Sequence, residues 1–173
     1  TQADRLSKII QRVRTYAKRQ HHEVKQENLS EIVDRALVSF RRSSLSSGID
    51  VEVKAPGKAD ALADALELEL LIVNLLKNAA AASKDSREKL ISVQLSEEAN
   101  EWLLSVSDHC QVISDKLLSR LSHPAKSLSD GLGLGLSICR LIAENHGGKL
   151  TFKPNNSKGL IVTLHLPKAN KEI

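Results

Sequence analysis

Three glycines alternate with leucines at Gly131, Gly133 and Gly135, directly before a segment with helical periodicity. Glycine lets a backbone approach a ligand closely and adopt positive φ angles. A helix beginning near Leu136 would point free N–H groups and partial positive charge into this turn, which suits a phosphate group. The pattern is neither a Walker loop nor a dinucleotide fingerprint, because Gly-Lys-Ser/Thr and a preceding hydrophobic strand are both missing. Taken alone, it fits a phosphate site or a tight loop in a hydrophobic fold.

The remaining periodicity predicts an α+β fold. Steps of three and four between apolar residues indicate helices, and alternation indicates strands. The expected helices cover residues 28–47, 64–82 and 136–146, and the expected strands cover 49–53, 90–95, 102–106, 150–152 and 160–166. Residues 108–130 have weak periodicity and are expected to form a long connection. We predict a two-layer sandwich of about three helices on a mixed, largely antiparallel sheet of about five strands.

A separate helix is expected at the start of the chain. Its apolar residues form a single stripe, and the rest of its surface is polar and mostly basic: Leu6, Ile9, Ile10, Val13 and Ala17. One helix cannot bury its own stripe, so a partner helix is required. We interpret residues 1–26 as half of a helical hairpin in a dimeric bundle, and residues 27–173 as the compact domain.

Composition excludes several classes of protein. The chain has 173 residues, of which 41% are hydrophobic and only 2% aromatic, so the core is aliphatic. No apolar run approaches the roughly 18 residues of a membrane helix. The net charge of +4 is spread along the chain without aromatic platforms or a nucleic-acid-binding motif, so we expect no nucleic-acid partner. Cys110 and Cys139 have no metal-ligand spacing and are expected to be reduced thiols.

Two motifs together resemble a known family. Residues 130–148 closely resemble the second glycine box of the histidine kinase ATPase domain, a branch of the family shared with gyrase, Hsp90 and MutL. Residues 68–82 resemble the N box of that family. Residues 5–14 are similar to the second dimerisation helix of nitrogen- and oxygen-sensing kinases. Resemblance therefore covers nearly the whole chain.

The resemblance implies an ATP-dependent protein histidine kinase domain that uses Mg²⁺. It implies that the γ-phosphoryl group passes to a histidine on a helix outside this chain, and later to the aspartate of a response regulator receiver domain. It further implies a homodimer and a cytoplasmic location, which in a membrane-bound sensor would be the cytoplasmic part. The residues expected to bind the nucleotide in this region are Lys126, Gly131, Leu132, Gly133, Leu134, Gly135 and Leu136.

Asn74 and Asn78 lie one helical turn apart on one face of the predicted helix. The resemblance implies that Asn78 supplies an amide oxygen to Mg²⁺, which prefers oxygen ligands. Asn74 stands where hydrolytic relatives carry a glutamate. Because an amide cannot act as a general base, water attack is disfavoured and phosphoryl transfer is favoured. We therefore predict both as catalytic residues and regard a gyrase-like hydrolase as less well supported.

Asp108 matches the aspartate of the first glycine box, which in the family accepts a hydrogen bond from the adenine amino group. A turn aspartate at a strand end is the alternative. The glycines of this box are replaced by Cys110 and Val112. If either residue took positive φ, strain would weaken ATP binding, and if the loop instead relaxed outward, the adenine pocket would be looser. We therefore expect weak ATP binding, and expect glycine at both positions to tighten it about tenfold if strain is relieved. The replacement also leaves open a degenerate module that acts by docking or dimer geometry.

His22-Glu23 superficially resembles a phosphoacceptor pair. The family motif also requires a proline a few residues later, where this chain has Glu27. The pair further lies at the end of the predicted second dimerisation helix rather than within the first. We therefore expect that the acceptor histidine is not His22 and that the chain does not phosphorylate itself.

Overall fold

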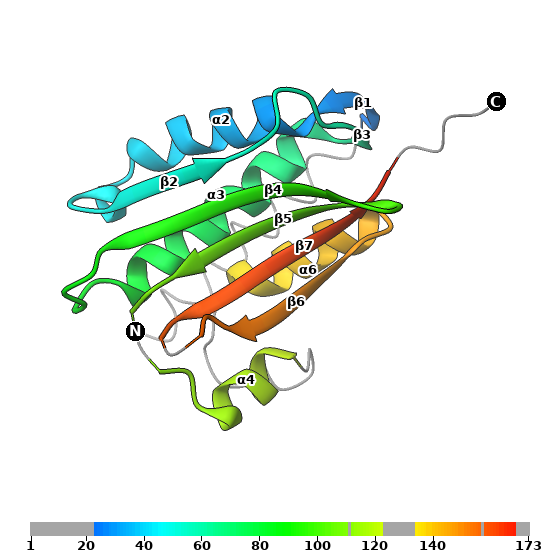
Figure 1. The fold of residues 1–173 in the computed structure, drawn as a ribbon. Helices are drawn as coiled ribbons and strands as arrows, with labels where there is room; N and C mark the ends of the chain where they lie inside the picture. Colours follow the sequence, from blue (N-terminus) through cyan, green and yellow to red (C-terminus); the bar gives the residue numbers. More distant parts are fainter. Residues whose placement is uncertain (1–22, 111, 123–133, 157, 169–173) are drawn as a thin grey trace, which may run out of the picture.

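The computed structural model describes residues 23–110, 112–122, 134–156 and 158–168, and its ribbon is a curved sheet with helices behind it (Figure 1). In chain order the elements are β1 (Lys25–Asn28), α2 (Leu29–Arg41), η1 (Ser44–Ser46), β2 (Asp50–Lys54), β3 (Asp60–Ala63), α3 (Ala65–Ala82), β4 (Leu90–Glu98), β5 (Glu101–Asp108), α4 (Asp115–Ser122), α6 (Leu134–Asn145), β6 (Lys149–Pro154) and β7 (Leu160–Pro167).

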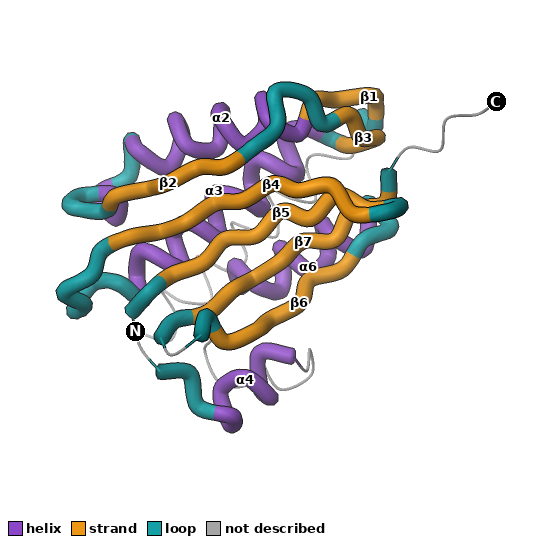
Figure 2. The backbone as a smooth tube through the Cα atoms, in the orientation of Figure 1, coloured by secondary structure: helices purple, strands orange, loops and turns teal. Residues whose placement is uncertain are grey.

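The main sheet has the order β2-β4-β5-β7-β6. β2 runs parallel to β4, and the other neighbours are antiparallel, which confirms the predicted mixed sheet of five strands. Figure 2 shows α2, α3 and α6 behind one face of this sheet. Apolar residues alternate along the central strand β5, so that Trp102, Leu104 and Val106 face the helices. The core therefore lies between a helical layer and one sheet face.

Polar caps begin the two long helices at the predicted residues. Asn28 Oδ1 accepts a hydrogen bond from Ser30 N at 3.1 Å, and Asp64 Oδ1 accepts from Leu66 N and Glu67 N at 3.0 and 3.1 Å. These bonds satisfy N–H groups that have no partner within the helix. The caps fix where α2 and α3 begin, and thereby fix the position of every α3 side chain over the sheet.

A buried histidine joins the end of α6 to the start of α3. His146 Nε2 accepts from Asp64 N at 3.0 Å, and His146 Nδ1 lies 2.7 Å from the carbonyl oxygen of Ile142. A carbonyl only accepts, so Nδ1 carries a proton. Nε2 accepts a hydrogen bond and therefore carries none, so this arrangement corresponds to the neutral Nδ1–H tautomer. α6 also packs directly on α3. This contact brings the helix after the glycine-rich turn beside the helix of the paired asparagines.

The structure differs from the sequence prediction in four places. The helix expected over residues 1–26 falls mostly outside the described residues, and its expected end is wrong because Lys25–Asn28 is a strand paired with β3. β1 and β3 were both missed. α2 ends at Arg41, before a short 3-10 turn, rather than continuing to Gly48. The expected connection contains α4, which makes four α-helices in the described part of the chain.

Within the described ranges, no helix is long and apolar enough to cross a membrane.

Candidate functional site

The two asparagines of α3 lie against the first turn of α6. A Cβ placed on Gly135 would be 3.4 Å from Asn74 Oδ1 and 3.9 Å from Asn78 Oδ1. Asn74 Nδ2 donates to the carbonyl oxygen of Leu70 at 2.8 Å, which leaves its Oδ1 toward Gly135. Asn78 is exposed, and its side-chain amide makes no hydrogen bond to another described residue. The structure therefore brings together residues of the two motifs that lie about sixty positions apart in the sequence.

Asp108 ends the buried face of β5. Alternation places its carboxylate on the same side as Trp102, Leu104 and Val106, and the residue is only 6% exposed. The β6–β7 turn packs against its backbone: Asn155 Nδ2 donates to the Asp108 carbonyl oxygen at 2.8 Å. Burial of a carboxylate at the end of an apolar strand face costs free energy unless the group is paired or hydrogen-bonded.

A cavity of about 250 Å³ lies between Asn78 and Asp108. These two residues are the polar groups of its lining. Its walls are aliphatic and come from α3, α4, α6, strands β5 and β7, and the loop before α4: Leu75, Ala79, Ala81, Ala82, Val106, Ile113, Leu117, Leu121, Leu136, Leu160 and Val162. An apolar cavity whose lining includes one carboxylate and one amide suits a flat heterocycle that carries a polar substituent.

α4 forms one wall of the cavity and is attached to α6. An Arg140 guanidinium nitrogen donates to the carbonyl oxygen of Leu121 in the last turn of α4, and the guanidinium stacks on Phe152 with 5.1 Å to the ring centroid. Burial lowers the pKa of Arg140. The apolar side chains Leu117 and Leu121 face the cavity as a result.

The segment after Asp108 is not strained in the way its sequence suggested. Among described residues, the non-glycine positions with positive φ are Ala99 and Asn156, so neither Cys110 nor Val112 is one of them. Left-handed strain, one of the two ways in which these replacements were expected to weaken ATP binding, is therefore absent at both positions. Both cysteines are free thiols, as predicted. Burial raises the pKa of Cys110, and the adjacent Asp108 carboxylate adds to this effect.

Several predicted site residues fall outside the described ranges, namely Lys126, Gly131, Leu132 and Gly133. Leu134 is the first residue of α6, and Leu136 lines the cavity. Asn155 and Gly159, in the turn between β6 and β7, were not predicted from the sequence as site residues. A Cβ on Gly159 would lie 2.0 Å from the Asp108 carbonyl oxygen, and Gly159 has a φ of +98°. No local sequence pattern indicates this contact between residues far apart in the chain.

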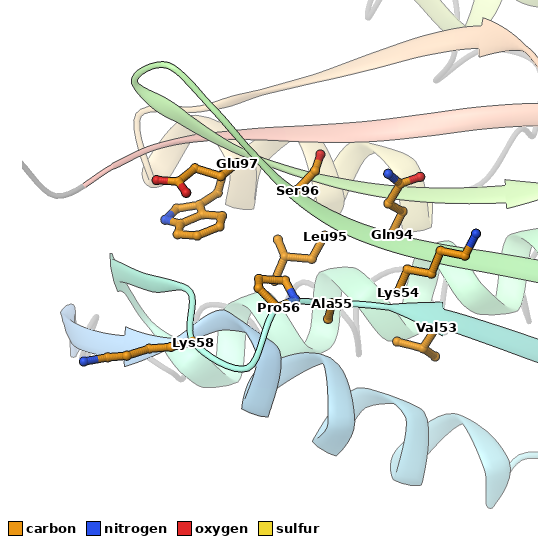
Figure 3. Close-up of a pocket in the computed structure, with 10 residues that line it drawn as sticks. Val53, Lys54, Ala55, Pro56, Lys58, Gln94, Leu95, Ser96 and Glu97 are labelled. Carbon is orange, nitrogen blue, oxygen red and sulfur yellow. The ribbon is translucent and has the colours of Figure 1, made fainter.

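A second hollow, of about 530 Å³, lies between β4 and the segment that follows β2 (Figure 3). It is wider and more open than the cavity beside Asp108. Its lining includes Lys54, Pro56, Gln94, Glu97 and Trp102. No residue predicted to bind nucleotide lines it. Its size alone therefore does not make it the functional site.

The family described as histidine kinase-, DNA gyrase B- and HSP90-like ATPases matches residues 63–170. The chain belongs to this family. Sensor protein FixL of Bradyrhizobium diazoefficiens is 30% identical over 176 residues, which cover 98% of this chain and 34% of FixL. The C4-dicarboxylate transport sensor protein DctS of Rhodobacter capsulatus is 31% identical, over 96% of this chain and 26% of DctS. This chain thus spans about a third or less of these relatives.

Solved histidine kinases share the fold. The nucleotide-free catalytic domain of histidine kinase ThkA superposes with a TM-score of 0.70 at 26% identity, covering 84% of this chain and 96% of that domain. ThkA in complex with response regulator protein TrrA gives a TM-score of 0.76 at 24% identity, covering 99% of this chain and 50% of ThkA. This member of the family is the ATP-binding catalytic domain of a two-component sensor histidine kinase.

Proposed function

We propose that this domain binds Mg-ATP in the cavity between Asn78 and Asp108 and transfers the γ-phosphoryl group to a histidine outside the chain. The observation that carries the proposal is that Gly135 lies close to the side chains of Asn74 and Asn78, beside a cavity whose lining includes the buried Asp108. Asp108 would accept a hydrogen bond from the adenine amino group. The first turn of α6 would face the phosphates with free N–H groups.

Asn78 fits a magnesium ligand. Its amide oxygen is the kind of hard donor that Mg²⁺ prefers, and the side chain is exposed beside the α6 turn. In the described part of the chain, no cluster of three histidine, cysteine or acidic side chains offers an alternative metal site. Bound magnesium would neutralise phosphate charge, with triphosphate oxygens and water completing its ligands.

The chain's own residues would then act by position. Asn74 carries a carboxamide, which cannot act as a general base toward water. Its NH₂ group donates to the carbonyl oxygen of Leu70. The phosphoryl group would leave ADP and form a bond to an acceptor histidine nitrogen held in line. The acceptor is proposed to lie on a dimerisation hairpin, of which the residues before β1 supply part, while the chain from β1 onward forms the catalytic domain of a homodimer. A response regulator would accept the phosphoryl group next.

The test is phosphorylation of a separately supplied dimerisation domain that contains an acceptor histidine. Incubation with this chain and Mg-ATP should place acid-labile phosphate on the supplied domain and none on the chain itself. Asn78→Ala should reduce the rate at least about a hundredfold, as for loss of a positioned transition-state group. Gln94→Ala, in the second hollow, is the matched control and should leave the rate unchanged. Phosphate that appears on the chain alone and is lost in His22→Ala would contradict the proposal.

A further inference from the structure

The residue after Asp108 is held from two sides. His109 Nε2 lies 3.3 Å from Ser92 Oγ on β4, and His109 Nδ1 lies 3.3 Å from Asn155 Nδ2 in the β6–β7 turn. The same amide nitrogen of Asn155 donates to the carbonyl oxygen of Asp108 at 2.8 Å. One side chain of the turn therefore contacts both the backbone of Asp108 and the ring of its neighbour.

The direction of each hydrogen bond follows from the donors available. The Asn155 NH₂ group can only donate, so His109 Nδ1 must accept and be unprotonated. The ring proton is then on Nε2, which donates to Ser92 Oγ. The network accordingly specifies the neutral Nε2–H tautomer of His109.

The next residue ties the segment to α3. Cys110 N donates to Asp108 Oδ1 at 3.3 Å, and Cys110 Sγ lies 2.9 Å from Ser83 Oγ. The Ser83 hydroxyl already donates to the carbonyl oxygen of Ala79 at 2.8 Å. The thiol therefore donates to Ser83, which is fully buried at the end of α3. Ala79 lines the cavity, so this connection leads back to the proposed site.

We propose that His109 and Asn155 are positioning residues that hold the Asp108 carboxylate where it recognises the exocyclic amino group of adenine. The inference rests on the proposed role of Asp108. A flexible glycine segment leaves a neighbouring carboxylate free to move. Here side chains of β4 and of the β6–β7 turn fix both the carbonyl of Asp108 and the ring that follows it. Base selectivity should then depend on residues that do not touch the nucleotide.

The test is calorimetric titration of ADP and inosine diphosphate, in which a carbonyl oxygen replaces the amino group, both with Mg²⁺. The parent chain should prefer ADP. His109→Ala and Asn155→Ala should each weaken ADP binding about tenfold while changing inosine diphosphate binding less than about twofold. Ser105→Ala is the matched control, because Ser105 lies on β5 with Asp108 and loses only its 2.9 Å contact to Thr163 on β7, outside the network. It should leave both affinities unchanged.

Folded variants that keep the parent's preference for ADP would overturn the inference while leaving the role of Asp108 intact. Equal binding of the two nucleotides by the parent would instead contradict adenine recognition by Asp108, and the inference with it. Weakening of both nucleotides to the same extent would indicate a merely structural role. ¹⁵N NMR of the parent chain at neutral pH provides a test without any variant. The Nε2–H tautomer of His109 is expected, and the Nδ1–H tautomer would overturn the proposal.

Discussion

At the scale of single residues, the site depends on a glycine that faces the backbone of Asp108. Gly159 has a φ of +98° and no room for a Cβ, which would lie 2.0 Å from the Asp108 carbonyl oxygen. Gly159→Ala should destabilise the domain by more than about 2 kcal/mol, because the clash adds to the cost of positive φ. Gly48→Ala is the control, since Gly48 has a φ of +70° but open space around it.

Urea unfolding of both glycine variants measures the difference, and nucleotide titration shows whether Asp108 has moved. Gly48→Ala should cost about 1 kcal/mol and leave nucleotide binding unchanged. Equal destabilisation by the two substitutions would show that the turn yields to a Cβ, and that Gly159 is not needed to hold the strand end.

Cys139 couples the packing of α3 and α6 to pH. It is 0% exposed, its Sγ lies 3.6 Å from the carbonyl oxygen of Leu71, and burial raises its pKa to about 12 from an ordinary value of 9.0. Between these values the unfolded chain loses the proton and the folded chain keeps it, so stability falls as pH rises. From pH 8 to pH 10, ionisation of this thiol in the unfolded chain should lower the free energy of unfolding by on the order of 1 kcal/mol.

Urea unfolding of the parent and of Cys139→Ala at the two pH values isolates this contribution, because all other titrating groups are common to both. The stability advantage of the parent over Cys139→Ala should shrink at pH 10. An advantage that stays constant would contradict a pKa raised by burial.

The altered first glycine box gives a prediction opposite to the one its sequence suggested. Cys110 and Val112 have no positive φ to relieve, and Cys110 contacts Ser83. Glycine at both positions would remove that contact and increase the freedom of the loop in the unliganded state. We expect Cys110→Gly with Val112→Gly to weaken ADP binding several-fold in calorimetry. Tighter binding would restore the strain argument.

At the scale of the elements, α3 carries the site and its cap sets its register. Asp64 caps two N–H groups of the first turn, and its other carboxylate oxygen accepts from Glu23 N at 3.1 Å. Asp64→Ala should cost about 1–2 kcal/mol in urea unfolding. Asp64→Asn keeps an amide oxygen at the cap and should cost much less. Similar losses in both variants would show that the charge, rather than the cap, matters.

The elements that sequence could predict are those with a long apolar period. α3, β4, β5 and β7 were predicted because their buried faces repeat regularly. β2 and β6 were predicted from short runs with apolar residues at alternate positions. β1 and β3 have four residues each and are held mainly by pairing with one another, so neither has a clear pattern. α4 has only eight residues and buries only Leu121 fully, so its apolar pattern is too short to stand out within the expected connection. The asparagines and Asp108 were predicted from motifs, whereas Asn155 and Gly159 act through tertiary contacts that no local pattern encodes.

At the scale of the whole molecule, nucleotide should bind only the folded domain and therefore stabilise it. Mg-ADP at a concentration a hundred times its Kd should add about 3 kcal/mol and raise the melting temperature by several degrees. Asn78→Ala should remove the part of this increase that requires magnesium. An unchanged melting curve at millimolar nucleotide would favour a module that acts by docking or dimer geometry.

The most direct test of the proposed ATP site is to locate the bound nucleotide in the fold. Titration of ¹⁵N-labelled protein with Mg-ADP should shift backbone amide signals of the first α6 turn, the Asn78 side-chain amide and the amides around Asp108. These residues surround the cavity between α3 and β5. Signals from Lys54, Gln94 and Trp102, which line the second hollow, should not move. Shifts concentrated around that hollow, or no shifts at millimolar nucleotide, would contradict the proposed ATP site.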